Sequence, residues 1–203
     1  MTIYGSPKSS AGRCFWCLEE VGATYENKSI NFREGEHKSA EFMKINPNGK
    51  IPVLVHDDFT IWESMGINFY LADAFKPELL GADSKVRGLV HQWSIWSIAD
   101  LQAPLIAIFI QLVFVPEDKR DHKVIEQAQK KLPAMFETLD RALGDSQYLA
   151  GDLFTLADLN VASVVAVCQE IKYDMSAYKN INNWLGQLSE RPAYQKYESL
   201  KSE

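Results

Sequence analysis

Apolar positions change their spacing along the chain, and this change divides the chain into two parts. In the first part, short apolar runs alternate with segments whose apolar residues return every three or four positions. The short runs predict strands at 1–6 and 23–31 and a hairpin at 51–62. Helices are expected at 11–22, 39–46 and 63–74. This alternation of strands and helices indicates a small mixed α/β domain.

From residue 84 onward only helical spacing remains, so an all-helical domain is expected there. One helical face of the run 126–143 carries four large apolar residues, Leu132, Met135, Leu139 and Leu143. Pro133 lies within this run and is expected to kink or interrupt the helix. The segment 77–83 contains Pro77 and Gly81 and is the expected linker. The pattern therefore predicts an α/β domain over 1–76 and an all-α domain over 84–203.

The composition narrows the class of protein. With 46% hydrophobic and 24% charged residues, the 203-residue chain has the balance of a globular protein. A net charge of −6 gives no support to binding nucleic acid or an anionic membrane. The N-terminus lacks the pattern of a signal peptide, and the longest apolar run, 104–116, is shorter than the roughly 20 residues of a membrane span. Three cysteines are too few for a disulfide framework, so a soluble, cytoplasmic protein is expected.

Two short motifs of the first part contain unusual residues for their positions. In "NPNGKIPVL" the expected strand begins with Pro52, which cannot donate a backbone hydrogen bond. A proline there fits either the start of an edge strand or a cis bond that turns the preceding backbone outward. In "IWES", Glu63 and Ser64 open a helix directly after a strand. A helix start favours a bound carboxylate, although the same two residues also suit an ordinary helix cap.

These motifs occur together with others in one known family. The segment "GEHKSAEFMKINPNGKIPVL" followed by "IWES" resembles the glutathione site of phi and theta-like cytosolic glutathione transferases. "YLAGDLFTLADLNVAS" and "RPAYQKY" resemble the capping segment and the C-terminal helix of the same family. The resemblance covers nearly the whole chain and implies a thioredoxin-like N-terminal domain, an all-α C-terminal domain and a homodimer. It also implies glutathione as co-substrate, with no metal and no organic cofactor.

The resemblance implies glutathione contacts for seven residues, His37, Lys38, Lys50, Ile51, Pro52, Glu63 and Ser64. The Ile-Pro bond of the family is cis, which leaves the backbone of Ile51 free to pair with the cysteinyl part of the peptide. Ser64 is expected to receive the γ-glutamyl carboxylate, with Glu63 close to the ammonium. His37 and Lys38 are expected to contact the glycine carboxylate, since both can donate hydrogen bonds to an anion. The alternative is that this loop is solvated and that the two side chains bind no ligand. Lys50 stands where the phi class usually has glutamine, and a lysine can also reach a carboxylate.

The segment "SPKSSAGRC" joins the first strand to the first helix and is the expected reactive end. A thiol with a pKa of about 8.5 is mostly protonated at neutral pH, and a hydroxyl donor at a helix start can favour the thiolate. The resemblance implies a serine in this role. Counting forward from Tyr4 as in the phi pattern, and back from Arg13 as in the theta and delta pattern, leads to Ser9 in both cases. Ser10 is the alternative, and one of the two serines is expected to serve only the helix cap or turn.

Cys14 and Cys17 form a Cys-x-x-Cys motif, which in a thioredoxin-like domain raises a redox alternative. The reactive cysteine of a redox domain lies at the very start of this helix, where the present chain has serines. Both cysteines are therefore expected inside the helix as inert apolar residues. Farther along, Thr155 and Asp158 form an expected capping box, a folding device without a catalytic role.

The electrophilic co-substrate is expected to bind against the helical domain. In the family the corresponding helix walls that pocket, and the candidates here are Trp93, Trp96 and Phe109. The leading interpretation is a glutathione transferase that conjugates the thiolate to small, mostly apolar electrophiles, as in detoxification. One alternative keeps the site but performs isomerisation, dehalogenation, or peroxide or thiol reduction. Another is a non-catalytic protein-interaction module with this fold.

Overall fold

The computed structural model of the chain describes residues 1–202, which form two compact units. The first unit contains residues 1–80 together with the C-terminal segment from 189 onward, and the second contains 81–188. The division after Leu80 falls within the expected linker 77–83. The C-terminal segment, which the sequence pattern assigned to the helical domain, packs with the N-terminal unit.

The N-terminal unit is built on a four-stranded sheet in the order β2-β1-β3-β4. Its strands are β1 (Thr2–Tyr4), β2 (Glu26–Lys28), β3 (Val53–His56) and β4 (Phe59–Trp62). β2 runs parallel to β1, whereas β3 is antiparallel to both β1 and β4. The parallel connection passes through the helix α1 (Gly12–Glu20), as parallel strands require a crossover. This mixed sheet confirms the predicted thioredoxin-like domain.

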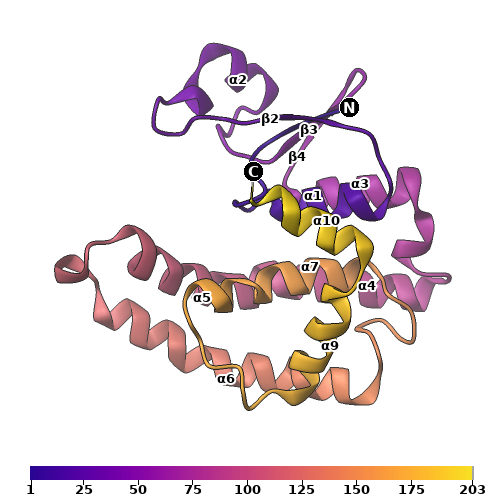
Figure 1. The fold of residues 1–203 in the computed structure, drawn as a ribbon, viewed down its shortest axis with the longest axis vertical. Coiled ribbons are helices and arrows are strands. Elements are labelled where there is room, and N and C mark those ends of the chain that lie inside the picture. The colour runs from indigo at the N-terminus through magenta and orange to yellow at the C-terminus, as the bar shows by residue number, and fades with distance from the viewer. Residues whose placement is uncertain (203) are drawn as a thin grey trace. The chain divides into compact units, whose positions relative to one another are not determined.

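The remaining helices of this unit are α2 (Ala40–Ile45), α3 (Ser64–Phe75), α10 (Pro192–Leu200) and the short turns η1 (Glu36–Lys38) and η2 (Pro77–Leu80). α1 packs against both α3 and α10 (Figure 1). The core is formed by fully buried residues of the sheet, α1 and α3, including Ile3, Leu54, Phe15, Leu18, Ile67 and Leu71.

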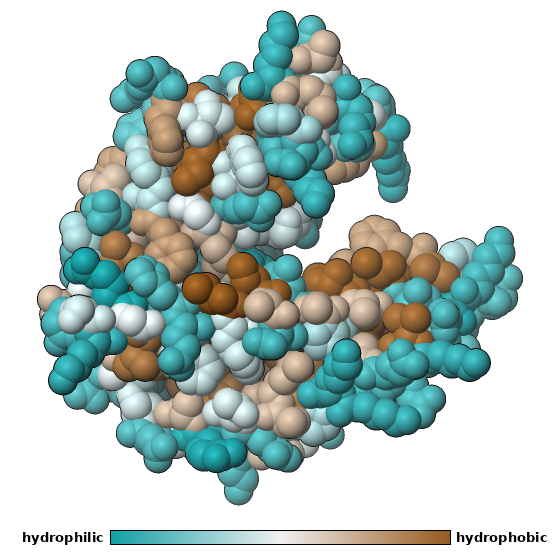
Figure 2. All heavy atoms as spheres, turned by 180° about the vertical axis from the view of Figure 1, so that it is seen from behind, coloured by the Kyte–Doolittle hydropathy of each residue, from teal (hydrophilic) through white to brown (hydrophobic). Residues whose placement is uncertain are grey.

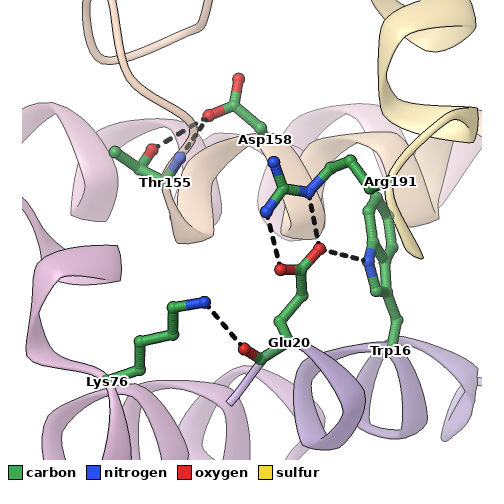
Figure 3. A network of polar contacts seen from close by, with 6 residues as sticks. All are labelled: Trp16, Glu20, Lys76, Thr155, Asp158 and Arg191. Atoms are coloured by element: carbon green, nitrogen blue, oxygen red, sulfur yellow. Dashed lines mark hydrogen bonds and ion pairs between the residues drawn. The ribbon is translucent and has the colours of Figure 1, made fainter. Parts of the chain in front are cut away.

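A buried ion pair joins the C-terminal helix to α1. The carboxylate of Glu20, whose side chain is 3% exposed, receives two hydrogen bonds of 2.7 Å from the guanidinium of Arg191. The indole of Trp16 donates a third hydrogen bond of 3.1 Å to the same carboxylate (Figure 3). The ammonium of Lys76 donates to the backbone carbonyl of Glu20 at 3.0 Å. A buried carboxylate needs such partners, so this pairing fixes where α10 docks.

The second unit consists of helices joined by loops, and its described residues form no strand apart from one isolated bridge between Tyr148 and Gly151. Its α-helices are α4 (Ser84–Trp96), α5 (Gln102–Phe109), α6 (His122–Asp145), α7 (Leu156–Val165), α8 (Val167–Glu170) and α9 (Lys179–Ser189). π-Helical turns η3 (Ser97–Leu101) and η4 (Ile110–Phe114) follow α4 and α5, and a 3-10 turn η5 (Glu117–Lys119) precedes α6. α6 continues through Pro133, so the expected interruption does not occur. Pro133 lies on the exposed face of the helix.

Asp158 organises the polar interior of the helical unit. Its buried carboxylate accepts hydrogen bonds from the backbone N–H of Thr155 at 2.9 Å and from the Thr155 hydroxyl at 3.1 Å (Figure 3). The other oxygen accepts from the N–H of Leu149 at 2.9 Å and from the indole of Trp184 at 3.1 Å. Burial raises the pKa of Asp158, and these hydrogen bonds oppose the rise. The predicted capping box is present and also ties the start of α7 to a loop and to α9.

The helical stretch Ser84–Phe114 exposes much of its apolar surface. By length and hydropathy alone it could cross a membrane, a weak indication because core helices of soluble proteins pass the same test. Only 28% of its most apolar window is buried, and Ile95, Ile110, Val113 and Phe114 are exposed. Figure 2 shows apolar side chains gathered on the surface of this unit. An exposed apolar surface of this kind marks a place for a ligand or a partner chain.

Candidate active site

The register of the sheet brings three loops of the N-terminal unit to one end. Tyr4, the last residue of β1, lies opposite Val53, the first residue of β3. Val53 in turn lies opposite Trp62, the last residue of β4. The chain therefore leaves β1, enters β3 and leaves β4 at the same end of the sheet. The predicted site residues after β1, before β3 and after β4 are thereby brought close together.

The loop before β3 leaves a segment of backbone without internal partners. The Ile51–Pro52 peptide bond is cis, as the resemblance implied. Among residues 1–202, neither the N–H nor the carbonyl of Ile51 makes a backbone hydrogen bond. Asn46, which is 2% exposed, supports the loop by donating to the Lys50 carbonyl at 2.7 Å. Its carbonyl oxygen accepts from the N–H of Asn48 at 3.0 Å, so both ends of the amide are used.

The turn η1 packs against this loop and supplies positive charge. A Cβ on Gly49, which has a φ of 60°, would lie 2.9 Å from the carbonyl oxygen of His37 and 3.2 Å from Nζ of Lys38. This close approach explains why a glycine stands there, because any side chain would push the two segments apart. Lys38 and Lys50 are exposed, and neither ammonium forms an ion pair within residues 1–202. Two uncompensated cations on adjoining loops favour an anionic group of a ligand.

His37 is held in place by Phe32. The two rings stack with centroids 4.5 Å apart and planes at 27°. Nδ1 of His37 is buried and has no hydrogen-bond partner within the described residues, which leaves Nε2 as the nitrogen for an external partner. Phe32 was not among the predicted site residues; it is exposed and extends the surface beside His37.

The start of α3 is strained in a way that the sequence did not reveal. Glu63 has a φ of 71° and a ψ of 118°, although it is not a glycine. Such a conformation costs about 1–3 kcal/mol and concentrates at functional sites. The side chain of Glu63 makes no capping hydrogen bond to α3. Glu63 therefore does not serve as the ordinary helix cap that the sequence also allowed. Ser64 is the first residue of the helix and follows Trp62 by two residues, at the end of the sheet where Trp62 pairs with Val53.

Ser9 lies in the loop between β1 and α1 and is exposed. Its hydroxyl donates to the carbonyl of Ser6 at 2.8 Å and accepts from the N–H of Ala11 at 3.1 Å. The Ser6 carbonyl also accepts from the N–H of Ser9 at 3.0 Å. The hydroxyl can therefore turn toward a ligand without leaving that carbonyl unpaired. Ser10 is exposed too, and its side chain makes no hydrogen bond among residues 1–202.

The two cysteines of α1 lie behind this site as packed core residues. Cys14 donates to the carbonyl of Ser64 at 3.5 Å, and Cys17 donates to the carbonyl of Asn68 at 3.8 Å. Burial raises the pKa of the Cys14 thiol to about 12 and that of Cys17 well above its usual range. Buried, protonated thiols are poor nucleophiles, so the geometry gives no support to the redox alternative. The Cys14 contact instead joins the start of α1 to the start of α3.

Known proteins are similar to this chain in both architecture and sequence. The model of the glutathione S-transferase N-terminal domain matches residues 1–73, and that of the C-terminal domain matches residues 102–192. Glutathione S-transferase 1 of Zea mays is 35% identical over 206 aligned positions, which cover 98% of this chain and 96% of the relative. The chain belongs to the glutathione S-transferase family.

Solved structures of the family agree with this assignment. Glutathione S-transferase I from maize, in complex with an atrazine glutathione conjugate, has a TM-score of 0.90 and 34% identity, covering 99% of this chain and 97% of that chain. The theta-class glutathione S-transferase from Xanthomonas axonopodis pv. citri, with glutathione bound, has a TM-score of 0.89 and 30% identity, covering 96% and 95%. The likeness therefore extends over both units of this transferase.

The predicted electrophile residues all lie on the helical unit of the transferase. Trp93 is buried and packs edge to face against Trp96, with ring centroids 5.2 Å apart. Phe109 is partly exposed and contacts Phe114 edge to face at 5.6 Å. Phe114 is 71% exposed and was not among the predicted residues, although it ends the apolar run that drew attention to this helix.

Proposed function

We propose that this transferase binds glutathione at the end of the sheet and uses Ser9 to stabilise its thiolate. The observation that carries the proposal is the unpaired backbone of Ile51, at the end of the sheet where the loop of Ser9 and the start of α3 also lie. An extended peptide can pair with such a backbone as a strand pairs with a sheet edge. Glutathione is a short peptide with a thiol at its centre and a carboxylate at each end, which suits the surrounding groups.

The charges of the loops support one orientation of the peptide. The cysteinyl backbone of glutathione pairs with Ile51 next to Pro52. Its γ-glutamyl carboxylate lies at the N-terminus of α3, where Ser64 and the helix dipole favour an anion, and Glu63 faces the ammonium. The glycine carboxylate then lies near the imidazole of His37 and the ammonium groups of Lys38 and Lys50. In this orientation the thiol points toward the loop of Ser9.

Stabilising the thiolate is the chemical contribution of Ser9. A hydrogen bond from its hydroxyl, with the dipole of α1, can lower the pKa of the thiol by about two units, equivalent to about 2.7 kcal/mol. The thiolate sulfur then attacks an electrophilic carbon, a sulfur-carbon bond forms, and the leaving group departs with its electron pair. Trp96 and Phe109, with Trp93 behind them, are the proposed apolar contacts for that substrate.

Two inexpensive measurements test this function. Retention of the protein on immobilised glutathione, with elution by free glutathione, is the expected result for the binding step. A panel of a halonitrobenzene, an organic peroxide, an epoxide and a disulfide then identifies the reaction, and turnover of the halonitrobenzene is expected. Absence of both retention and turnover would instead support a non-catalytic module that uses the fold for protein contacts.

Replacing Ser64 with alanine is expected to weaken glutathione binding by about tenfold or more. The change removes a hydrogen bond to a charged carboxylate, which contributes roughly 1.5–3 kcal/mol. Isothermal titration calorimetry measures the effect. Ser84→Ala is the matched control, because Ser84 is also the first residue of a helix but lies in the other unit. Equal glutathione affinities for the Ser64 and Ser84 variants would leave Ser64 with a purely structural role.

The transferase is further expected to be a homodimer in solution. Phe59 of β4 and Phe75 at the end of α3 are 44% and 40% exposed. Phe59 lies against Tyr70 with ring centroids 4.9 Å apart, and His56 contacts both Tyr70 and Phe75, so these rings form one aromatic patch on the N-terminal unit. A patch of large aromatic side chains is typical of an interface between chains.

Light scattering after size exclusion, at micromolar concentration, checks this expectation. The predicted mass is about twice the 23.0 kDa of one chain. Phe59→Glu is expected to shift the protein toward monomer, because it places a charge in the middle of the aromatic patch. A native protein that elutes with the mass of a single chain would contradict the proposal.

The proposal requires no metal or organic cofactor besides glutathione as co-substrate. It places the protein in the cytoplasm, whose glutathione pool supplies the thiol. Conjugation of small apolar electrophiles would serve detoxification.

A further inference from the structure

The hydroxyl of Tyr197, on the C-terminal helix α10, closely approaches the backbone at the start of α1. Gly12 is the first residue of α1 and is buried. A Cβ added to Gly12 would lie 2.6 Å from the hydroxyl oxygen of Tyr197 and 2.6 Å from the carbonyl oxygen of Pro7. Both distances are too short for a real Cβ. The C-terminal helix and the loop after β1 therefore meet at this glycine with no room for a side chain.

Gly12 is in turn bonded to Ser9. The backbone N–H of Gly12 donates to the carbonyl of Ser9 at 2.8 Å. The N–H of Ala11 donates to the Ser9 hydroxyl at 3.1 Å, and that hydroxyl donates to the carbonyl of Ser6 at 2.8 Å. The direction of the Ser9 hydroxyl therefore depends on the position of the first turn of α1.

Contacts on both faces of its ring hold Tyr197 in place. The ring is parallel to the indole of Trp16, with planes at 5° and centroids 6.4 Å apart. The ammonium of Lys201 lies 4.4 Å from the centroid of the Tyr197 ring, a distance typical of a cation–π contact. Trp16 is itself fixed by its hydrogen bond to Glu20, whose ion pair docks α10 (Figure 3). These contacts leave the hydroxyl of Tyr197 little freedom to move away from Gly12.

The hydroxyl of Tyr197 contributes volume and a dipole at this point, but no charge. Burial raises the pKa of Tyr197 above its ordinary value, although the charge of Lys201 opposes the rise. The phenol is therefore neutral throughout the pH range in which the thiol of glutathione titrates. Removing it changes no charge near the thiolate, so any effect on the thiol has to come from a displaced hydrogen-bond donor.

We propose that Tyr197 is a positioning residue for the transferase reaction, because its hydroxyl fixes the first turn of α1 and thereby the direction of the Ser9 hydroxyl. This role rests on the proposed use of Ser9 to stabilise the thiolate. Without the Tyr197 hydroxyl, the turn can shift into the vacated space beside Gly12. A hydrogen bond weakens steeply as its angle departs from linearity, so the shifted donor stabilises the thiolate less.

Tyr197→Phe tests this role, because it removes the hydroxyl and keeps the ring. The pH profile of turnover with a halonitrobenzene is expected to shift upward by about one unit. At pH 7 the thiolate fraction, and kcat with it, then falls about threefold, whereas the rates of the variant and the native protein converge near pH 9. The KM for glutathione is expected to stay unchanged. A variant that was merely less stable would lose the same fraction of its turnover at every pH.

Tyr194→Phe is the matched control. Tyr194 lies on the same helix and contacts the same indole, with ring centroids 4.8 Å apart, but its hydroxyl is bonded to Glu198 and not placed at Gly12. Its pH profile is expected to coincide with that of the native protein. An equal shift for Tyr194→Phe would show that general packing of α10, and not the hydroxyl at Gly12, controls the thiolate.

Amide hydrogen exchange tests the contact without glutathione. The N–H groups of Ala11 and Gly12 are expected to exchange about tenfold faster in Tyr197→Phe than in the native protein or in Tyr194→Phe. Unchanged exchange would overturn the role of Tyr197. If Ser9→Ala shifted the pH profile and Tyr197→Phe did not, the role of Tyr197 would be refuted and that of Ser9 would stand. If neither variant shifted the profile, the role of Ser9 would be refuted, and that of Tyr197 with it.

Discussion

Replacing Ser9 with alanine is expected to lower turnover at neutral pH by about 20-fold. If the thiol pKa returns from near 6.5 to about 8.5, the thiolate fraction at pH 7 falls from about three quarters to a few per cent. Glutathione affinity is expected to change little, because the contacts of Ile51 and Ser64 remain. Initial rates with a halonitrobenzene, measured across pH, show the effect as a shift of the profile to higher pH.

Variants of neighbouring residues make this result specific. Ser10→Ala is expected to keep most of the turnover, and a larger loss for Ser10 than for Ser9 would assign the role to Ser10. Cys14→Ala and Cys17→Ala are expected to keep turnover apart from any loss of packing, because both thiols are buried and protonated. If Cys14→Ala abolished activity and the native protein formed a mixed disulfide with glutathione, the protein would be a thiol reductase.

Asp158→Ala is expected to destabilise the transferase by roughly 3–5 kcal/mol, the largest stability effect predicted for this chain. The variant leaves the N–H groups of Leu149 and Thr155 and the indole of Trp184 buried without an acceptor, and each such loss costs about 1–3 kcal/mol. Natural proteins are stable by only about 5–15 kcal/mol, so much of the folding free energy is removed. Thermal unfolding should begin about 10 °C lower for a chain of this size.

Asp152→Ala provides the control for this prediction. Asp152 lies in the loop just before the capping box, is exposed, and makes no hydrogen bond or ion pair within the described residues. Its replacement is expected to change the unfolding free energy by less than about 0.5 kcal/mol. Equal melting temperatures for the two variants would show that the carboxylate of Asp158 contributes little to folding.

Much of the N-terminal unit could be predicted from local sequence. Apolar spacing located β1, α1, β3 and α3, because each of these elements has a buried face that its own residues reveal. β4, which has no buried residue, was predicted as the second strand of the hairpin. The cis Ile51–Pro52 bond was also expected, but only through the resemblance, since spacing alone left an edge strand equally open. Ser9, Ile51 and Ser64 are brought together by the register of the sheet. Register is a pairing between distant segments, so no local sequence pattern predicts it.

Other features depend on contacts between residues far apart in the sequence. Glu20 and Arg191, 171 positions apart, dock α10 on the N-terminal unit, and neither residue is unusual in its own segment. The left-handed backbone of Glu63 has no signal in the residue type, because glutamate rarely adopts it. The supporting role of Asn46 could have been predicted from the sequence. It begins an Asn-Pro-Asn-Gly turn, and the side-chain amide of an asparagine in that position commonly hydrogen-bonds the backbone of its own turn. Its burial, however, became clear only in the folded chain.

The most direct test of the account is a pH titration of glutathione bound to the native protein and to Ser9→Ala, followed by the ultraviolet absorbance of the thiolate. The account predicts an apparent pKa about two units below the free value on the native protein, and a value close to that of free glutathione on the variant. The same pKa on both proteins would contradict the role of Ser9. An unshifted pKa on the native protein would contradict thiolate stabilisation altogether.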